Sequence, residues 1–239
     1  MSAPRNFAVV TAAGQSRRMG GTDKLTLPLE GRPLIVKTLE RFLTWPKLDS
    51  VVVSVTPGRE RELSELFACT GESHRIRVLA GGRERQDSIR LALELIYQEL
   101  QPASQDLVLI HDGARPFVDH QLFETLLASL PGQDGVLPAT PVRDTIKRVV
   151  GHRVEKTEDR DTLRQVQTPQ LFPFELIHRL HQRAHEEGFL GTDDASLVER
   201  YGGTVGWVEG PAHNLKVTVP EDIPLLEELA RRATTGAPR

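Results

Sequence analysis

The sequence contains little of what several classes of protein depend on. It has one cysteine, Cys69, among 239 residues, which excludes a disulfide framework and a multi-cysteine metal cage. Its longest apolar runs, such as Leu107–Ile110, have four residues, so we expect neither a membrane-spanning segment nor a signal-peptide core. Positive charge is not in excess, because 30 Lys and Arg residues stand against 33 Asp and Glu residues. This balance argues against a general nucleic-acid surface, and the composition predicts a soluble cytoplasmic protein.

What is present is an alternation of short β-rich runs and amphipathic helical patterns, which is typical of a layered α/β fold. The predicted strands are Phe7–Thr11, Ser50–Val55, Arg75–Leu79, Asp106–Ile110, Gly135–Ala139 and Val205–Glu209. The predicted helices are Pro33–Phe42, Arg59–Phe67, Arg85–Leu100, Asp119–Leu130, Pro173–Glu186, Thr192–Tyr201 and Pro220–Arg232. Strand–helix–strand units of this length favour right-handed crossovers. We therefore expect a doubly wound, mostly parallel sheet with the most apolar strand, Asp106–Ile110, near its middle.

The pattern changes at Pro141. Segment Asp144–Lys156 predicts a β-hairpin turning at Gly151, with charged and apolar positions in alternation. An isolated hairpin is only marginally stable in water, so it needs support from the body or from another subunit. We interpret residues 141–170 as a projecting β-arm and expect it to form a homodimer contact. No linker or repeat divides the chain, so we expect a single domain over residues 1–239 with a disordered tail at 233–239.

The loop after the first strand carries the strongest chemical signal. Segment Ala12–Lys24 reads AAGQSRRMGGTDK, in which small residues allow a ligand to approach backbone N–H groups. Arg17, Arg18 and Lys24 add positive charge suited to a triphosphate. The loop contains neither the P-loop pattern nor the G-x-G-x-x-G dinucleotide pattern. Taken alone, it could also be a glycine-rich turn with solvated arginines.

Other segments narrow the interpretation when they are taken together with this loop. In order along nearly the whole chain they are Gly81–Ser88 (GGRERQDS), His111–Pro116 (HDGARP), Thr168–Gln170 (TPQ) and Asn214–Thr218 (NLKVT). The set resembles the 2-C-methyl-D-erythritol 4-phosphate cytidylyltransferase family of the non-mevalonate isoprenoid pathway. The resemblance implies a Rossmann-like nucleotidyltransferase fold, with CTP and methylerythritol 4-phosphate as substrates.

The reaction that the resemblance implies is attack of the substrate phosphate on the α-phosphorus of CTP, with pyrophosphate as leaving group. A phosphate dianion needs no general base, so the site must supply positive charge and alignment. By resemblance, Arg18 and Lys24 stabilise the transition state and the departing pyrophosphate. Lys216 would bridge the two reacting phosphates, and Arg160, on the arm, would position the substrate phosphate of the neighbouring subunit.

The resemblance also implies binding residues. The nucleotide-binding candidates are Ala12, Ala13, Gly14, Gly82 and the hydroxyl group of Ser88. The substrate-binding candidates are Asp112, Arg115, Thr145, Thr168 and Thr192. Asp112 is also the candidate to lie near Mg²⁺, which the triphosphate oxygens would mainly hold. Two of these residues could have a structural role instead of a binding role: Asp112 could cap the following turn, and Thr192 could cap a helix.

Two other functions stay open. Ribitol-5-phosphate cytidylyltransferases share several of these motifs and differ mainly in their polyol contacts, and a non-catalytic nucleotide-binding module could keep the fold without turnover. Departures from the family pattern are Asp23, where proline is common, and Arg83, where some members carry aspartate near the cytosine. We interpret His178, His181 and His185, which share a helical face, as solvated side chains rather than metal ligands.

Overall fold

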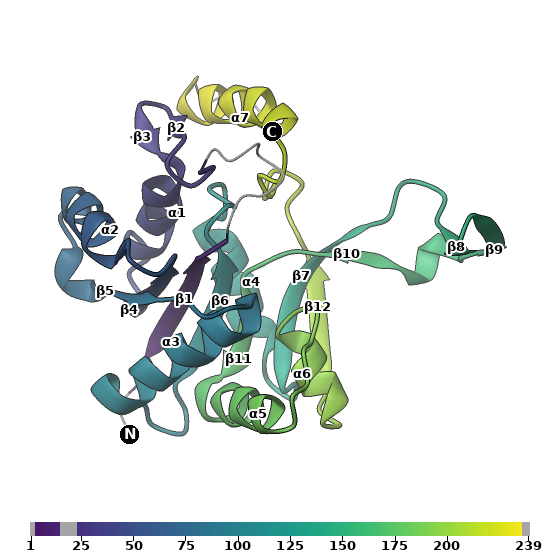
Figure 1. The fold of residues 1–239 in the computed structure, drawn as a ribbon, viewed down its shortest axis with the longest axis horizontal. Coiled ribbons are helices and arrows are strands. Elements are labelled where there is room, and N and C mark those ends of the chain that lie inside the picture. The colour runs from purple at the N-terminus through teal and green to yellow at the C-terminus, as the bar shows by residue number, and fades with distance from the viewer. Residues whose placement is uncertain (1–2, 15–22, 236–239) are drawn as a thin grey trace.

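The computed structural model describes residues 3–14 and 23–235, with side chains as far as Arg231. Its main sheet is built from β1 (Asn6–Ala12), β4 (Leu48–Val55), β5 (Ile76–Ala80), β6 (Leu107–Asp112), β7 (Gly135–Pro141), β10 (Arg164–Val166), β11 (Gln170–Pro173) and β12 (Val205–Glu209). The strand order is β10-β7-β11-β6-β1-β4-β5, and β12 pairs with β7 (Figure 1). A small separate ribbon pairs β2 (Pro28–Leu29) with β3 (Arg32–Pro33).

The sheet is mixed but mostly parallel. β1 lies between β4 and β6 and is parallel to both, β5 is parallel to β4, and β12 is parallel to β7. β11 runs antiparallel between β6 and β7, and β10 runs antiparallel to β7. The predicted α/β class and the interior position of the most apolar strand are confirmed. The sequence analysis missed β10 and β11, which are short and lie on either side of Pro169.

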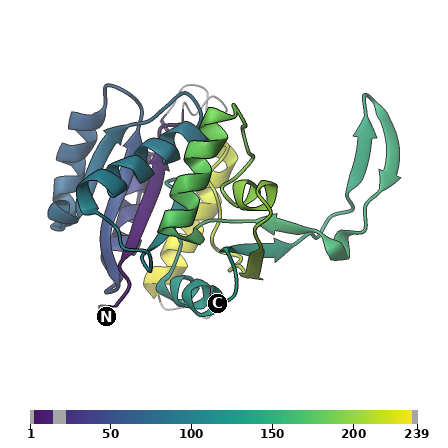
Figure 2. The ribbon, with the colours of Figure 1, turned by 90° about the horizontal axis from the view of Figure 1, so that it is seen from below.

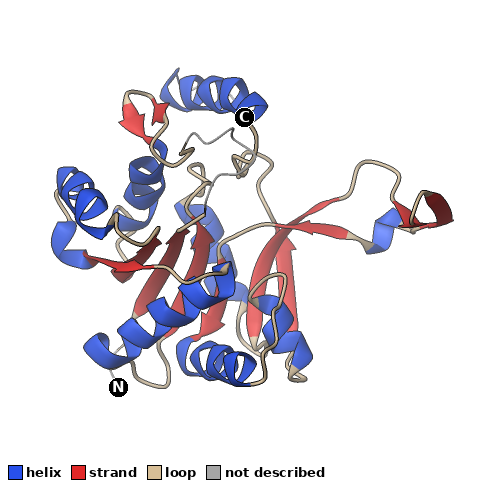
Figure 3. Ribbon diagram, viewed as in Figure 1, coloured by secondary structure: helices blue, strands red, loops and turns tan. Residues whose placement is uncertain are grey.

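Helices cover both faces of the sheet, because successive strand residues point to opposite sides. The helices are α1 (Leu34–Leu43), α2 (Glu60–Phe67), α3 (Arg85–Leu100), α4 (His120–Ser129), α5 (Phe174–Glu186), α6 (Ala195–Arg200) and α7 (Ile223–Thr235). Ala8 and Val10 of β1 pack with α1, α2, α4 and α7, whereas Phe7 and Val9 pack with α3, α5 and α6. Figure 3 shows the resulting layers of helix and strand. Among the described residues, no helix has the length and apolar character needed to cross a membrane.

Several predicted boundaries agree closely with the structure and two do not. The ranges of α3 and β12 are those predicted. Helix α6 begins only at Ala195, and its cap position is Asp194 rather than Thr192. Helix α7 follows a 3-10 turn and continues to Thr235, so the first three residues of the predicted disordered tail are helical.

The segment between β7 and β10 leaves the body of the molecule as the predicted arm (Figure 2). At its tip, β8 (Lys147–Val150) and β9 (Arg153–Thr157) pair only with each other among the described strands. The turn between them uses Gly151 at a positive φ of 57°, a conformation that glycine adopts without strain. A short 3-10 turn, η4 (Arg160–Thr162), lies on the way back to the sheet.

Candidate active site

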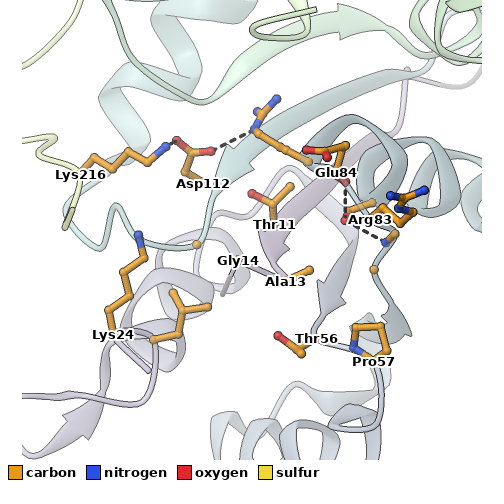
Figure 4. A pocket seen from close by; sticks show the side chains of 17 residues that line it. Thr11, Ala13, Gly14, Lys24, Thr56, Pro57, Arg83, Glu84, Asp112 and Lys216 are labelled. Atoms are coloured by element: carbon orange, nitrogen blue, oxygen red, sulfur yellow. Dashed lines mark hydrogen bonds and ion pairs between the residues drawn. The ribbon is translucent and has the colours of Figure 1, made fainter. Parts of the chain in front are cut away.

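A pocket of about 710 Å³ opens where four parallel strands end (Figure 4). Ala13 and Gly14 follow β1, Thr56 and Pro57 follow β4, Gly81–Arg83 follow β5, and Gly113 follows β6. Open α/β sheets bind their ligands at the carboxyl ends of the strands. Lys24 and Lys216 reach the same pocket from segments that lie far apart in the sequence. The structure therefore brings together the described ends of the loop, the Gly-Gly segment and both predicted lysines.

The Gly-Gly segment is packed too tightly for larger residues. A Cβ atom on Gly81 would lie 2.5 Å from the Cβ of Ala13, and one on Gly82 would lie 2.3 Å from the Cβ of Asp87. The hydroxyl group of Ser88 accepts the N–H of Gly82 at 3.0 Å and donates to the carbonyl of Glu84 at 3.1 Å. Ser88 is buried and also lines the pocket, so its hydroxyl group fixes the shape of this loop, and its contact with the nucleotide stays a prediction.

The two lysines present their ammonium groups on one side of the pocket, and Arg83 lies on the other (Figure 4). The Nζ atom of Lys216 lies 2.7 Å from Oδ2 of Asp112. The Nζ atom of Lys24 donates to the carbonyl of Val217 at 2.9 Å. Fixed cations in this position suit a triphosphate and the negative charge that develops during phosphoryl transfer.

Asp112 is buried at the end of β6 and is surrounded by positive charge. Besides Lys216, the Nε atoms of Arg85 and Arg115 lie 3.3 and 3.7 Å from its carboxylate oxygens. Burial raises the pKa of Asp112, but the charges of Arg85, Lys216 and Arg115 outweigh it and hold the pKa far below its usual range. The carboxylate is therefore ionised and fixes the surrounding cations, and its side chain does not cap the following turn.

Arg115 positions the segment that carries Lys216. Its Nη1 donates to the carbonyl of Asn214 at 2.7 Å, and the N–H of Val217 donates to the carbonyl of Ala114 at 2.9 Å. The Arg115 side chain is only 11% exposed. The guanidinium group thus has partners within the protein, and its expected contact with substrate hydroxyls stays a prediction.

Thr168 is likewise engaged inside the protein. Its hydroxyl oxygen accepts the N–H of Asp112 at 3.0 Å and lies 3.1 Å from Nδ1 of His111. The other ring nitrogen, Nε2, lies 3.1 Å from the carbonyl of Arg115, which can only accept. This pairing assigns the ring proton to Nε2, so Nδ1 accepts from the Thr168 hydroxyl. Thr168, which lies just before β11, thus supports the end of β6, and its contact with the polyol stays a prediction.

His111 makes the stability of the protein depend on pH. Its side chain is completely buried, and burial lowers the pKa of the imidazole to about 4 from 6.5. Between these values the unfolded chain takes up a proton that the folded chain refuses, so stability falls as pH falls. We expect the free energy of unfolding to drop by about 3 kcal/mol across this window from His111 alone.

Urea unfolding at pH 7 and at pH 4.5 measures this effect. His111→Gln should be less stable than the unmodified protein at pH 7 but should lose less stability on acidification. The control is His74→Gln, because the His74 side chain is 74% exposed, and it should leave the pH dependence unchanged. An unchanged pH dependence in His111→Gln would contradict the assignment.

The remaining predicted residues lie elsewhere. Ala12 is buried at the end of β1 and does not line the pocket. Thr192 lines a smaller neighbouring pocket of about 100 Å³, together with Arg85 and Asp194. Thr145 and Arg160 are exposed on the arm and are not among the residues that line the pocket. Arg18 lies outside the described residues.

The structure also corrects the interpretation of the histidines. His181 is completely buried, and its Nε2 lies 3.1 Å from Oδ1 of Asp194. His178 stacks against Tyr97 and Phe174 and bonds to Glu94. His181 is shielded from solvent and His178 largely so, because this part of α5 packs against α3 and α6, whereas His185 is 54% exposed, as predicted.

Sequence reasoning missed two parts of the site. Thr56 and Pro57 line the pocket because β4 is parallel to β1, a pairing that local pattern does not reveal. Arg85 contacts both Asp112 and Asp194. The sequence did contain a signal for Arg85. Of the two arginines in the GGRERQDS segment, Arg85 is the one that begins the predicted helix.

The chain matches known proteins over most of its length. Residues 7–232 match the model of the family described as 2-C-methyl-D-erythritol 4-phosphate cytidylyltransferase. Relatives with this name include one from Geobacillus thermodenitrificans, 42% identical over 93% of this chain and 95% of its own, and one from Bacillus cytotoxicus, 41% identical over 92% and 95%.

Solved structures agree with the sequence relatives. A 2-C-methyl-D-erythritol 4-phosphate cytidylyltransferase from Thermus thermophilus is 34% identical with a TM-score of 0.74, and the alignment covers 93% of this chain and 98% of that one. A 4-diphosphocytidyl-2C-methyl-D-erythritol synthase from Anaerococcus prevotii is 27% identical with a TM-score of 0.81, over 96% and 97%.

Proposed function

Because the chain belongs to the 2-C-methyl-D-erythritol 4-phosphate cytidylyltransferase family, we propose that it transfers the cytidylyl group of CTP to 2-C-methyl-D-erythritol 4-phosphate. The observation that carries the proposal is the pocket itself. Lys24 and Lys216 meet there from opposite ends of the chain, beside small residues that leave backbone accessible. Such an arrangement suits a nucleoside triphosphate at the carboxyl ends of the strands.

In this reaction an oxygen of the substrate phosphate forms a bond to the α-phosphorus of CTP. The bond from that phosphorus to the bridging oxygen breaks, and pyrophosphate leaves with the bonding electron pair. The residues must hold two anions close together and stabilise the charge of the leaving group. In the proposed reaction Lys216 would lie between the two reacting phosphates, and Lys24 would lie beside the pyrophosphate. No proton transfer to a protein side chain is needed.

The described residues fit a magnesium ion that arrives with the nucleotide. They contain no group of three or more His, Cys, Asp or Glu side chains that could hold a metal by themselves. Asp112 is the nearby carboxylate, and both of its oxygens are engaged by Arg85 and Lys216. Magnesium bound through phosphate oxygens would neutralise part of the charge on the triphosphate. Asp112 would then lie next to that ion.

The arm supports a homodimer in which each subunit completes the site of the other. Val149, Val150 and Val154 are more than half exposed on a hairpin that has no partner strand outside itself among the described residues. Such an apolar surface suits contact with a second copy of the chain. Arg160 and Thr145 would then reach the neighbouring pocket and bind the polyol phosphate. The Nη1 atom of Arg160 donates a hydrogen bond to the backbone carbonyl of Arg143 at 2.8 Å, which orients the side chain.

Pyrophosphate release tests the proposal directly. The protein is supplied with CTP and magnesium, and with either methylerythritol 4-phosphate or ribitol 5-phosphate. Release with methylerythritol 4-phosphate alone is the expected result. Release with ribitol 5-phosphate alone would assign the protein to the other acceptor, and binding of CTP without release in either case would mean a nucleotide-binding module without turnover.

A further inference from the structure

Arg85 joins two buried carboxylates that belong to different parts of the fold. It is the first residue of α3, directly after the cap residue Glu84. Its Nε donates to Oδ1 of Asp112 at 3.3 Å, and its Nη2 lies 2.8 Å from Oδ2 of Asp194. Asp112 ends β6 inside the pocket, whereas Asp194 precedes α6 outside it. The guanidinium group therefore bridges the main pocket and the small pocket beside it.

At one end of the Arg85 bridge, Asp194 is held in place by its own contacts with the protein. The side chain of Asp194 is 1% exposed, and its other oxygen contacts the completely buried His181 of α5. Burial raises the pKa of Asp194, but the charge of Arg85 and the His181 contact outweigh it, so the pKa lies below its usual value. Gln170 fixes the adjoining backbone, because its side chain accepts the N–H of Ala195 and donates to Asp193. Asp194 is thus a fixed point in the layer formed by α5 and α6.

At the other end of the Arg85 bridge, Asp112 forms an ion pair with Lys216. The oxygen that Arg85 does not bond, Oδ2, lies 2.7 Å from Nζ of Lys216. Both carboxylate oxygens of Asp112 are therefore engaged: Oδ1 contacts Arg85, and Oδ2 contacts Lys216. The network has two carboxylates, Asp112 and Asp194, against the three cations of Arg85, Arg115 and Lys216, which leaves positive charge for an anionic ligand.

We propose that Arg85 is a positioning residue, which orients Asp112 from an anchor on Asp194 and thereby sets the place of the Lys216 ammonium group. The inference rests on the proposed function, because it assigns a role in the same reaction. A guanidinium group is suited to this task, since its planar fork offers two separated donors to two carboxylates. A lysine keeps the charge but offers one nitrogen, so it cannot bridge both.

A double-mutant cycle tests the inference in the full-length protein. Arg85→Lys should lower kcat by roughly tenfold with a smaller effect on KM for CTP, because positioning is lost while charge is kept. In a Lys216→Met background the same substitution should have almost no further effect, since the group that Arg85 orients is gone. Equal fold-losses in the two backgrounds would mean a merely structural role and would overturn the proposal.

Two further variants sharpen the cycle. Asp194→Asn removes the anchor but leaves the pocket lysines intact, and it should reproduce the loss of kcat seen in Arg85→Lys. Arg61→Lys is the matched control, because Arg61 is 93% exposed on α2 and pairs only with Glu65 in the structure described. It should behave as the unmodified protein. A wild-type kcat in Asp194→Asn would contradict the proposal that Asp194 anchors Arg85.

Chemical labelling of Lys216 gives a readout that does not depend on turnover. Acetylation by a limiting amount of acetic anhydride, followed by peptide mass spectrometry, should modify Lys216 several-fold faster in Arg85→Lys, because a loosened Asp112 protects the ammonium group less. Lys47, which is exposed outside the pocket, serves as the internal reference. If the unmodified protein shows no turnover but the labelling changes as expected, the proposed function fails while the positioning role stands. Unchanged labelling overturns the positioning role itself.

Discussion

Lys216→Met should lower kcat by about 10²–10³-fold, because a fixed cation at a site of developing charge contributes that much to the rate. Methionine keeps a similar length and removes the charge. The substitution also removes one of the cations around Asp112, yet Arg85 at 3.3 Å and Arg115 remain to keep that carboxylate ionised. The Lys216 side chain is 39% exposed, so its loss should leave the fold intact. Single-turnover pyrophosphate release at saturating CTP measures the effect.

The same loss is expected for Lys24→Met, whose ammonium group enters the pocket from the first loop. The control is Lys47→Met, because Lys47 lies on the surface and pairs with Glu124. That variant should turn over at the wild-type rate. Turnover at the wild-type rate in Lys216→Met or Lys24→Met would remove that lysine from the mechanism, provided that circular dichroism shows an unchanged fold.

Local pattern predicted most of the fold. The range of α3 was predicted correctly because its apolar residues recur at helical spacing over four turns. Strand β6 was predicted to be central because its first four residues, Leu107–Ile110, are all apolar. In contrast, β11 has four residues, and its pairing with β6 depends on residues more than 50 positions away. A short strand next to prolines gives no periodic signal to detect.

The candidate site was predicted only in part, because contacts between residues far apart in the sequence leave no local pattern. A motif identifies which residues gather in a pocket, but it does not say which way a hydroxyl group points. Ser88 and Thr168 belong to motifs, yet their hydroxyl groups bond within the protein at Gly82 and Asp112. The role of Arg85 depends on Asp194, which lies far along the chain, and on their common burial. Neither the distance nor the burial can be derived from the segment that contains Arg85.

Activity should return when two inactive variants, Arg160→Ala and Lys216→Met, are mixed. Alone, Arg160→Ala is expected to lower kcat/KM for methylerythritol 4-phosphate on the order of 10²-fold, since in the proposed function this cation binds the phosphate. In a mixed dimer, one site combines the intact Lys216 of its own body with the intact Arg160 of the other arm. The second site lacks both. Random exchange at equal concentrations would make half of the dimers mixed, so about a quarter of the wild-type activity should appear.

The control mixture is Lys24→Met with Lys216→Met. Both lysines belong to the pocket of one body, so no site of a mixed dimer can combine an intact pair, and no activity should return. Adding Val150→Asp to both members of the first pair should also prevent recovery, because it places a charge on the apolar tip of the arm, where Val150 is 67% exposed. If the first mixture stays inactive while size-exclusion chromatography with light scattering shows mixed dimers, Arg160 does not act in the neighbouring site. Recovery only in that mixture would show that the arm carries part of each active site to the other subunit.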